Sequence, residues 1–510
     1  MPLLKRAIDA DAGFVRLSPR SAPTCGTGAA GRMPARLPGD GEQYRFHFDM
    51  SRCIGCKCCV VACNEQNGNP AAINWRRVGE IEGGWYPHTQ RAYFSMGCNH
   101  CVNPTCLSGC PVDAYSKDPV TGIVRHSADA CIGCEYCTWN CSYGVPQYNP
   151  ERGVVGKCDM CHGRLALGQS PACVSACPEG AIAIEIVKTD DWRRAHAAAV
   201  PGRGVPTADG SVSTTRITLP KELPPNARPL DLSNVRPEAA HWPLVIMTVL
   251  TQLAVGAFAT IWLLQLLGAS TRLGVAALTS LVVAGLALTA STLHLGRPIH
   301  AYRALKMWRR SWLSREVVLF TGFAAIAGAY AGVLWFGLPD GPVIGGVTVL
   351  LGVGGVTASA YIYRVPSRPA WNTPYTLVQF NLTGALLGPL LTAAVGATDD
   401  RWVLVAAAAM GGAQLLLLAL RFFRLVAAGR IELQGTARLL STTLKSRFLF
   451  RTALLAVGAV VLPLMASAPL LWLALLLALA GEILGRYLFF VSVVPTHMAA
   501  PYLELGSEAA

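Results

Sequence analysis

No cysteine follows Cys177 in this chain of 510 residues, and all eighteen cysteines precede residue 178. Any metal or disulfide chemistry of thiols is therefore confined to the N-terminal part of the chain. From about residue 243 onward, long apolar runs alternate with short arginine-rich connections. The mean hydropathy of +0.38 thus averages a cysteine-rich soluble part with a membrane part, and the chain is too long for one ordinary domain.

Other features are also missing. Residues 1–41 lack the apolar core of a secretory signal, and no Arg-Arg pair precedes an apolar stretch, so they are predicted to be a disordered tail, with Met33 as an alternative start. No nucleotide-phosphate loop or flavin fingerprint stands out, which disfavours a stand-alone reductase with its own substrate site. The net charge of +13 does not indicate nucleic-acid binding, because many of the cations lie between apolar runs.

Sixteen cysteines form four groups, each of which begins with C-x2-C and ends with C-x3-C. Group 1 is Cys53, Cys56, Cys59 and Cys63; group 2 is Cys98, Cys101, Cys106 and Cys110; group 3 is Cys131, Cys134, Cys137 and Cys141; group 4 is Cys158, Cys161, Cys173 and Cys177. Groups 1 and 3 carry the C-x2-C-x2-C-x3-C run that holds 4Fe–4S clusters, and groups 2 and 4 are stretched variants that end in Cys-Pro.

The spacing has a physical reason in a cubane cluster. Three thiolates on a tight loop wrap one face of the cluster, and glycine (Gly55, Gly133) lets backbone amides approach the sulfides. The fourth cysteine starts a helix that points away, so it reaches the other cluster of a pair, and sixteen thiolates give four clusters. Eight disulfides would be dense even for a secreted miniprotein, and four groups that end in C-x3-C do not have zinc-ribbon spacing.

Four phrases carry a resemblance to a known family: "YRFHFDMSRCIGCKCCVVACNEQNG", "CNHCVNPTCLSGCP", "CIGCEYCTWNCSYGVPQYN" and "KCDMCHGRLALGQSPACVSACP". They resemble the four-cluster electron-transfer subunit of the dimethyl sulfoxide reductase superfamily of molybdoenzymes, over roughly residues 42–185. The resemblance implies an α+β ferredoxin-like fold, a double domain of two cluster pairs, over residues 42–190.

The resemblance also implies how the groups interleave. Each cluster would take three cysteines of one group and the last cysteine of another: Cys53, Cys56 and Cys59 with Cys177; Cys158, Cys161 and Cys173 with Cys63; Cys98, Cys101 and Cys106 with Cys141; and Cys131, Cys134 and Cys137 with Cys110. In related nitrate reductase subunits, tryptophan replaces the second cysteine of group 3 and the cluster is 3Fe–4S, so Cys134 predicts four cubanes. Trp139 is expected to pack against a cluster, Cys58 to be a spare loop residue, and Cys25 has no assignment.

The second part of the chain is predicted to be an all-α bundle of eight transmembrane helices over residues 242–497. Residues 191–241, rich in Pro, Arg, Asp and Ser, are expected to be an extended linker over the ferredoxin-like domain or along the membrane surface, and residues 498–510 a tail. The eight apolar segments, each long enough to cross about 30 Å of hydrocarbon, lie near 243–268, 273–293, 316–337, 343–363, 376–397, 402–422, 449–467 and 470–494.

Charges between these segments predict the orientation. An even number of crossings puts both ends of the bundle on the side of the iron–sulfur domain, where the connections carry fifteen cations, against only Arg272 and Arg401 on the other side. The fifteen are Arg297, Arg303, Lys306, Arg309, Arg310, Arg315, Arg364, Arg368, Arg421, Arg424, Arg430, Arg438, Lys445, Arg447 and Arg451. By the positive-inside rule, the iron–sulfur domain faces the cytoplasm from a multi-pass anchor in a bacterial inner membrane, unless a partner's export leader overrides this orientation.

Phrases of the second part resemble the membrane anchor of dimethyl sulfoxide reductase: "HWPLVIMTVLTQLAVGAF", "STLHLGRPIHAYRAL" followed by "SWLSREV", and "AGEILGRYLFF", which together span about 241–492. The chain therefore resembles a fusion of two subunits that are usually separate. In this anchor family the histidine of the "LHLG" phrase belongs to the quinol site, which maps to His294. Histidine titrates near neutral pH, so His294 suits both bonding a quinol headgroup and accepting its proton.

Glu482 and Arg486, one turn apart in the last apolar segment, are also candidate site residues. A charge near a helix centre costs about 2.5–3.5 kcal/mol, so both are expected to face the bundle interior, as a structural ion pair or as part of a quinone site or proton path. Arg315 and Glu316, which open the third segment close to the His294 connection, are secondary candidates.

No haem is expected, since the candidate histidines of this part, His241, His294, His300 and His497, all lie at segment ends.

The combined prediction is a non-catalytic electron conduit. Electrons would pass between menaquinone or ubiquinone in the membrane and a separate catalytic subunit with a molybdenum bis-pterin guanine dinucleotide cofactor. By family analogy the Cys53/Cys177 cluster lies nearest that subunit and the Cys110/Cys131 cluster nearest the membrane, and the resemblance leans toward sulfite oxidation or dimethyl sulfoxide-type reduction. The alternative, a redox-driven proton or ion transporter, is disfavoured because Glu482 is the only acidic residue deep in a segment.

Overall fold

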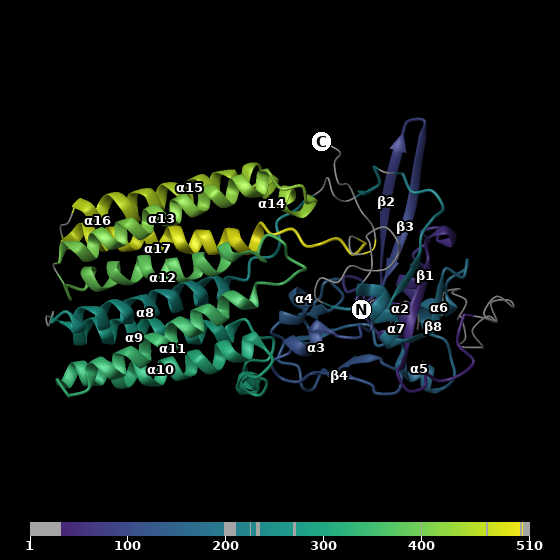
Figure 1. Ribbon diagram of the computed structural model, residues 1–510, viewed down its shortest axis with the longest axis horizontal. Coiled ribbons are helices and arrows are strands. Elements are labelled where there is room, and N and C mark those ends of the chain that lie inside the picture. Colours follow the sequence, from purple (N-terminus) through teal and green to yellow (C-terminus); the bar gives the residue numbers. More distant parts are fainter. Residues whose placement is uncertain are drawn as a thin grey trace, which may run out of the picture.

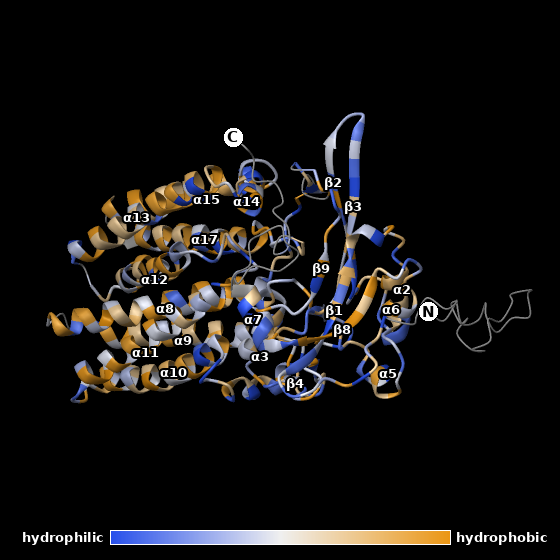
Figure 2. Cartoon of the chain, turned by 45° about the vertical axis from the view of Figure 1, so that its right-hand side comes forward, coloured by the Kyte–Doolittle hydropathy of each residue, from blue (hydrophilic) through white to orange (hydrophobic). Residues whose placement is uncertain are grey.

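The computed structural model describes residues 32–197, 211–224, 226–230, 235–268, 272–398, 400–465, 468–499 and 502. The described residues form two parts side by side, an α+β part and a bundle of long helices (Figure 1). Apolar residues run along the whole length of the bundle helices, whereas the α+β part mixes polar and apolar residues (Figure 2). The fold class predicted from the sequence is confirmed.

Two three-stranded sheets and two short hairpins frame the α+β part. In the first sheet, β1 (Glu42–Asp49) lies between the antiparallel β8 (Ile182–Lys188) and the parallel β9 (Arg216–Thr218). In the second, the hairpin of β2 (Arg77–Trp85) and β3 (His88–Met96) projects from the body and pairs with β10 (Arg228–Pro229) (Figure 1). The short hairpins are β4 (Tyr115–Lys117) with β5 (Val124–His126) and β6 (Gln147–Asn149) with β7 (Val154–Gly156).

Short helices follow the cysteine loops. They are α2 (Cys58–Asn67), α3 (Thr105–Gly109), α4 (Tyr136–Asn140), α5 (His162–Ala166) and α6 (Ala172–Ser175), with η1 (Met50–Arg52) before them and α7 (Thr189–Ala197) after β8. In front of α2 and α4, Gly55 and Gly133 have φ of +71° and +69°, and Lys57 and Glu135 are also left-handed. The loops of groups 1 and 3 therefore make the same tight turn, for which glycine is suited.

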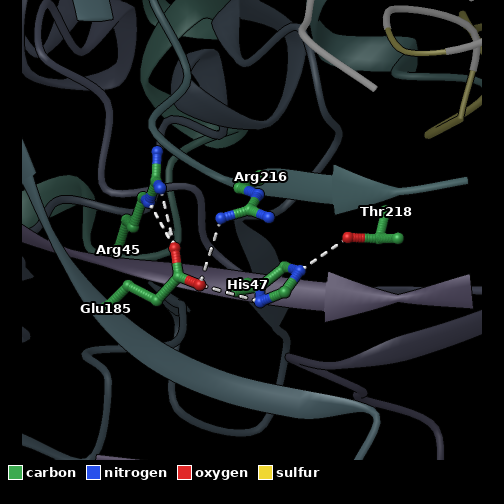
Figure 3. A network of polar contacts seen from close by, with 5 residues as sticks. All are labelled: Arg45, His47, Glu185, Arg216 and Thr218. Atoms are coloured by element: carbon green, nitrogen blue, oxygen red, sulfur yellow. Dashed lines mark hydrogen bonds and ion pairs between the residues drawn. The ribbon is translucent and has the colours of Figure 1, made fainter. Parts of the chain in front are cut away.

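The predicted linker is partly built into the sheets, because it supplies β9 and β10. Glu185 holds β9 in place: it accepts hydrogen bonds from Arg45 at 2.7 Å and from His47 at 2.8 Å, and lies 3.5 Å from Arg216 (Figure 3). His47 Nε2 also lies 2.8 Å from Thr218 Oγ1. Burial acts to raise the pKa of Glu185, but the hydrogen bond from His47 and the charge of Arg45 lower it to about 2, so this carboxylate is ionised at neutral pH.

The segment that follows the last long helix returns to the α+β part. Ala499 and Tyr502 are buried in its core, and the Tyr502 hydroxyl lies 2.7 Å from Ser213 Oγ. The Tyr502 ring also packs against Phe94 and Tyr143. Part of the segment predicted as a tail therefore joins the two parts.

Eight helices of the described residues are long and apolar enough to cross a membrane, as predicted. They are α8 (Trp242–Leu266), α9 (Leu273–Leu293), α10 (Trp312–Phe336), α11 (Gly341–Ile362), α12 (Pro374–Ala394), α13 (Arg401–Val426), a span of α15 (Lys445–Leu455), the π-helical η4 (Ala456–Val461) and α16 (Leu462–Met465), and α17 (Ala468–Val491).

The connections contain two helices that the sequence analysis did not predict, η3 (Pro298–Leu305) and α14 (Ile431–Ser441). In addition, α10 begins at Trp312 rather than residue 316, because the side chain of Ser311 caps it by accepting the N–H of Ser314. Arg421 and Arg451, counted above among the connections, lie inside α13 and α15.

Glycines bring α8 and α12 into backbone contact at the centre of the bundle. A Cβ added to Gly256 would lie 1.9 Å from the carbonyl oxygen of Gly384, and one added to Gly388 would lie 2.1 Å from the carbonyl carbon of Gly256. In a membrane, where lipid is as apolar as leucine, such close packing of small residues is a main source of helix association.

We predict that Gly256→Ala destabilises the bundle by about 1–3 kcal/mol, because the new methyl group must push α8 and α12 apart. The matched control is Gly285→Ala in α9, where an added Cβ meets nothing within 4 Å. Heating the detergent-solubilised protein and measuring the remaining monodisperse fraction compares the two variants. Equal midpoints would show that the glycine contact is not required.

Candidate iron–sulfur and quinone sites

The cysteines of the α+β part gather into four sets. All seventeen described cysteines are free, and Cys25 lies outside the described residues. The members of each set lie close enough for their charges to interact. Cys53 interacts with Cys56, Cys59 and Cys177; Cys63 with Cys158, Cys161 and Cys173; Cys101 with Cys98, Cys106 and Cys141; and Cys137 with Cys110, Cys131 and Cys134. Each set therefore combines three cysteines of one group with the last cysteine of another.

The donor chemistry of these sets suits an iron–sulfur cluster. Burial raises the pKa of Cys173 to about 12, in spite of the nearby charge of Arg76. A buried set of thiols is therefore protonated at neutral pH unless bound metal ions stabilise the thiolate form. In a zinc site all four sulfurs lie about 2.3 Å from one ion, whereas in a cubane the four thiolates each bind a different iron. Among the described residues, no three His, Cys, Asp or Glu side chains converge on the position of one metal ion.

Two buried cations lie beside the sets, and the sequence analysis missed both. Lys157 is 4% exposed, and its Nζ lies 3.6 Å from Cys98 Sγ and 2.9 Å from the carbonyl oxygen of Cys158. Burial acts to lower the pKa of Lys157, but the surrounding thiolates raise it overall. Arg76, 2% exposed, interacts with thiols of two sets. Positive charges beside a cluster tune its reduction potential. The only sequence feature that could have pointed to one of these cations is the position of Lys157 directly before Cys158.

The sets lie at different distances from the bundle. The set with Cys53 belongs to the region of α2 and α6, on the side away from the bundle, whereas α3 and α4 lie next to it (Figure 1). Cys56 is exposed, and the neighbouring Ile54 and Val61 present large apolar side chains to solvent. One end of the row of sets is therefore open to a partner, and the other end faces the membrane helices.

The loop of group 3 touches the connection that follows α9. The N–H of Gly296 donates to the carbonyl oxygen of Gly133 at 3.3 Å. A Cβ added to Gly133 or to Gly296 would lie 2.3 or 2.2 Å from the carbonyl oxygen of Gly153, so the three backbones meet without room for a side chain. The "LHLG" phrase thus supplies both His294 and the glycine through which its connection docks.

Arginines of the same connection strengthen this contact. Arg297 Nη1 donates to the carbonyl oxygen of Ala128 at 2.8 Å, and Arg310 forms an ion pair with Asp113 at 2.5 Å. The cations interpreted above from membrane topology therefore also hold the α+β part against the bundle.

A cavity of about 300 Å³ lies beside the contact. His294, Glu316 and Cys134 share its wall with Trp139 and Tyr363, and most of the other lining side chains are apolar. This volume is at the lower end of the range of small-molecule sites, and a largely apolar wall with a few polar groups is typical of them. The structure thus brings the predicted histidine and the secondary candidate Glu316 together with a thiol of group 3.

His294 caps the C-terminal end of α9. Its Nδ1 is buried and has no hydrogen-bond partner among the described residues. Burial lowers the pKa of His294 to about 4, the backbone of Ser291 opposes this, and the charge of His241 adds to it. The imidazole is therefore neutral at neutral pH and can accept a hydrogen bond, while its lowered pKa makes it a weak base.

Trp139 lies between this cavity and a second one of about 560 Å³. Its indole ring packs on His241 at 5.3 Å and on Trp371 at 5.7 Å, which are residues of the bundle rather than of the cysteine loops. The second cavity lies between the two parts, and its polar lining includes Glu135, Glu238, His241 and Arg368. His241 thus links the neighbourhood of His294 to a polar space.

Glu482 and Arg486 do not line the cavity that contains His294. Both are 1% exposed, and each is held by other partners. Glu482 accepts hydrogen bonds from Thr383 at 2.8 Å and Gln414 at 2.9 Å, and Arg486 donates to Gln252 at 2.8 Å. They belong to a separate polar centre within the bundle.

Comparisons with known proteins agree with this division. A 4Fe–4S dicluster domain matches residues 89–186, and the dimethyl sulfoxide reductase anchor subunit matches residues 238–491.

Relatives of the α+β part include one chain of the anaerobic dimethyl sulfoxide reductase of Haemophilus influenzae, 41% identical over 27% of this sequence and 71% of that protein. The corresponding chain of the Escherichia coli enzyme is 40% identical over 30% of this sequence and 78% of the relative. A subunit of the sulfite dehydrogenase of Allochromatium vinosum is 34% identical over 27% of this sequence and 67% of the relative. The protein belongs to the family of iron–sulfur electron-transfer subunits of dimethyl sulfoxide reductase type, with the membrane anchor of that family fused to it as a multi-pass domain.

Proposed function

We propose that this chain conducts electrons between quinol in the membrane and a separate molybdenum–pterin catalytic subunit through four 4Fe–4S clusters. The observation that carries the proposal is the cavity in which His294 and Glu316 share a wall with Cys134. A quinol bound there would lie beside a cluster ligand, so its electrons would have a short path into the α+β part. The carboxyl group of Glu316 and the imidazole of His294 both line this cavity, where each could bond one hydroxyl group of the quinol.

The four thiol sets are the proposed cluster ligands, with the membership given above. Bound clusters would supply one-electron carriers whose potentials depend on charge, hydrogen bonds and exposure. The protein's own contribution is to hold the thiols, to place Lys157 and Arg76 beside them, and to bury the sets near the bundle from water.

The residues of the cavity would handle protons as well as position the quinol. Oxidation of a quinol releases two electrons and two protons. The neutral imidazole of His294 accepts a hydrogen bond from one hydroxyl group and takes its proton as the electron leaves, because loss of the electron makes that hydroxyl group far more acidic. His241, whose charge acts on His294, lines the second cavity, so the proton could pass from His294 through His241 into that polar cavity. Trp139 keeps the two spaces apart.

The open end of the row of sets is the proposed docking surface for the catalytic subunit. Cys56, Ile54 and Val61 are exposed at or just before α2, which lies on the side away from the bundle, so a cluster held by this set would be close to the surface. The named relatives belong to dimethyl sulfoxide reductase and sulfite dehydrogenase, so a sulfoxide or sulfite is the proposed substrate class of the partner. The arginine-rich connections support a cytoplasmic iron–sulfur domain.

The cluster assignment predicts about sixteen irons per protein molecule, at four per cubane. Cys59→Ala should lower the iron content and remove one EPR signal, since it deletes a ligand, whereas Cys58→Ala should change neither. Iron analysis and EPR of the anaerobically purified protein measure both. Stoichiometric zinc, or loss of iron in the Cys58 variant alone, would contradict the assignment.

The quinol site predicts that His294→Ala lowers oxidation of a quinol analogue by at least about 100-fold, the contribution of a positioned acid–base group. The assay couples the purified protein to an artificial electron acceptor. His300→Ala, in the same connection but outside the cavity wall, is the matched control and should keep its rate. All cluster EPR signals should persist in both variants, and unchanged turnover in His294→Ala would refute the site.

A further inference from the structure

The second half of the bundle holds more buried positive than negative charge. Arg421, Arg451 and Arg486, from three different helices, lie close enough for their charges to interact. The acidic side chain that acts on Arg451 and Arg486 is Glu482. Ionised side chains within a membrane are costly and are normally paired, so one carboxylate leaves two of the three guanidinium charges unbalanced.

The three arginines differ in how they are satisfied. Arg421 donates to Gln379 Oε1 at 3.0 Å and to the carbonyl oxygen of Ala370 at 3.2 Å. Arg486 donates to Gln252, but its Nε and Nη1 have no hydrogen-bond partner among the described residues, and its guanidinium lies 3.6 Å from the centre of the Phe380 ring. Arg451 is 4% exposed, and its Nε has no hydrogen-bond partner among the described residues. A buried guanidinium that has an unpaired nitrogen and shares one carboxylate with two other arginines is a group that an additional anionic partner would satisfy.

Arg421 and Arg451 line one small cavity between α13, α14, α15 and α17. Its volume of about 20 Å³ holds one small polar group, such as an oxygen of a phosphate, and Ser492 supplies a further hydroxyl. Leu418, Phe422 and Phe448 make its remaining wall largely apolar. Phe423 and Phe450, next to lining residues, are 69% and 61% exposed on the bundle surface, where acyl chains lie.

The depth of this cavity suits a lipid headgroup. Arg421 lies five residues before the end of α13 and Arg451 six residues after the start of α15, which is about 8–9 Å from the helix ends at 1.5 Å per residue. Both ends are on the side of the iron–sulfur domain, and the segment between the two helices carries Arg430 and Arg438. Basic pockets between membrane helices on such a side bind anionic headgroups.

We propose that Arg421 and Arg451 bind the phosphate of an anionic phospholipid, with its acyl chains along α13 and α15. A lipid with two phosphates, such as cardiolipin, supplies the two negative charges that balance the three arginines against Glu482. The site is separate from the cavity of His294, so it does not rest on the proposed quinone chemistry.

Native mass spectrometry of the purified holoprotein, exchanged into detergent with defined lipid, tests this site. The wild-type protein should retain cardiolipin in preference to phosphatidylcholine, and Arg451→Gln should weaken retention about tenfold, as expected for loss of a charged hydrogen bond. Arg447→Gln, one turn earlier on α15 and exposed, is the matched control and should retain cardiolipin normally.

Three results would overturn the proposal: equal retention of both lipids by the wild-type protein, equal cardiolipin retention by Arg451→Gln, and full displacement of cardiolipin by millimolar inorganic phosphate, which would indicate a free-anion site. Iron content checks that each variant is folded. The lipid preference of the wild-type protein decides the question by itself if Arg451→Gln does not fold.

Discussion

The contact of Gly133, Gly153 and Gly296 is the constraint on which the arrangement of this protein depends. At this point three backbones approach so closely that no side chain fits between them. Two of the glycines belong to the α+β part and one to the connection after α9, so the contact fixes the distance between the third cysteine group and the membrane helices. An electron relay needs such a fixed and short distance at the point where it leaves the membrane.

Other features follow from this contact. With the group 3 loop held against the end of α9, Cys134 and His294 come to line one cavity, and Trp139 becomes the wall between that cavity and a polar one. Because the anchor and the iron–sulfur part are one polypeptide, the segments on either side of the bundle also connect the two parts. The segment before α8 contributes strands to the sheets, and Tyr502 returns to their core. The two parts are therefore tied together at both ends of the bundle sequence.

The sequence predicted what is encoded locally. Cysteine spacing marked the thiol loops, and the length of apolar runs marked eight helices, since both signals lie within a few consecutive residues. The "LHLG" phrase pointed to His294, which the structure places in the wall of the cavity proposed as the quinone site. Helix starts were less accurate, because a capping serine such as Ser311 is a weak signal beside an apolar run.

Features that depend on distant residues were not predictable in the same way. Lys157 and Arg76 act on thiols that lie far from them in sequence, and short strands such as β9 carry too few residues for a pattern. Glu482 and Arg486 were expected to face the bundle interior, as a structural ion pair or as part of a quinone site or proton path. Both are buried, but the folded bundle places them in a polar centre separate from the cavity of His294. Arg451 was counted among the cations of a connection, although it lies buried inside α15.

The proposed electron path crosses the contact between Gly133, Gly153 and Gly296. The direct measurement reduces the clusters of the holoprotein in nanodiscs with dithionite, adds a long-chain menaquinone, and follows cluster reoxidation by freeze-quench EPR. Wild-type clusters should reoxidise rapidly, and those of Gly296→Leu, with the full iron content, should reoxidise far more slowly, because the new side chain forces the two parts of the protein away from each other. Equal reoxidation rates in the two proteins would contradict the claim.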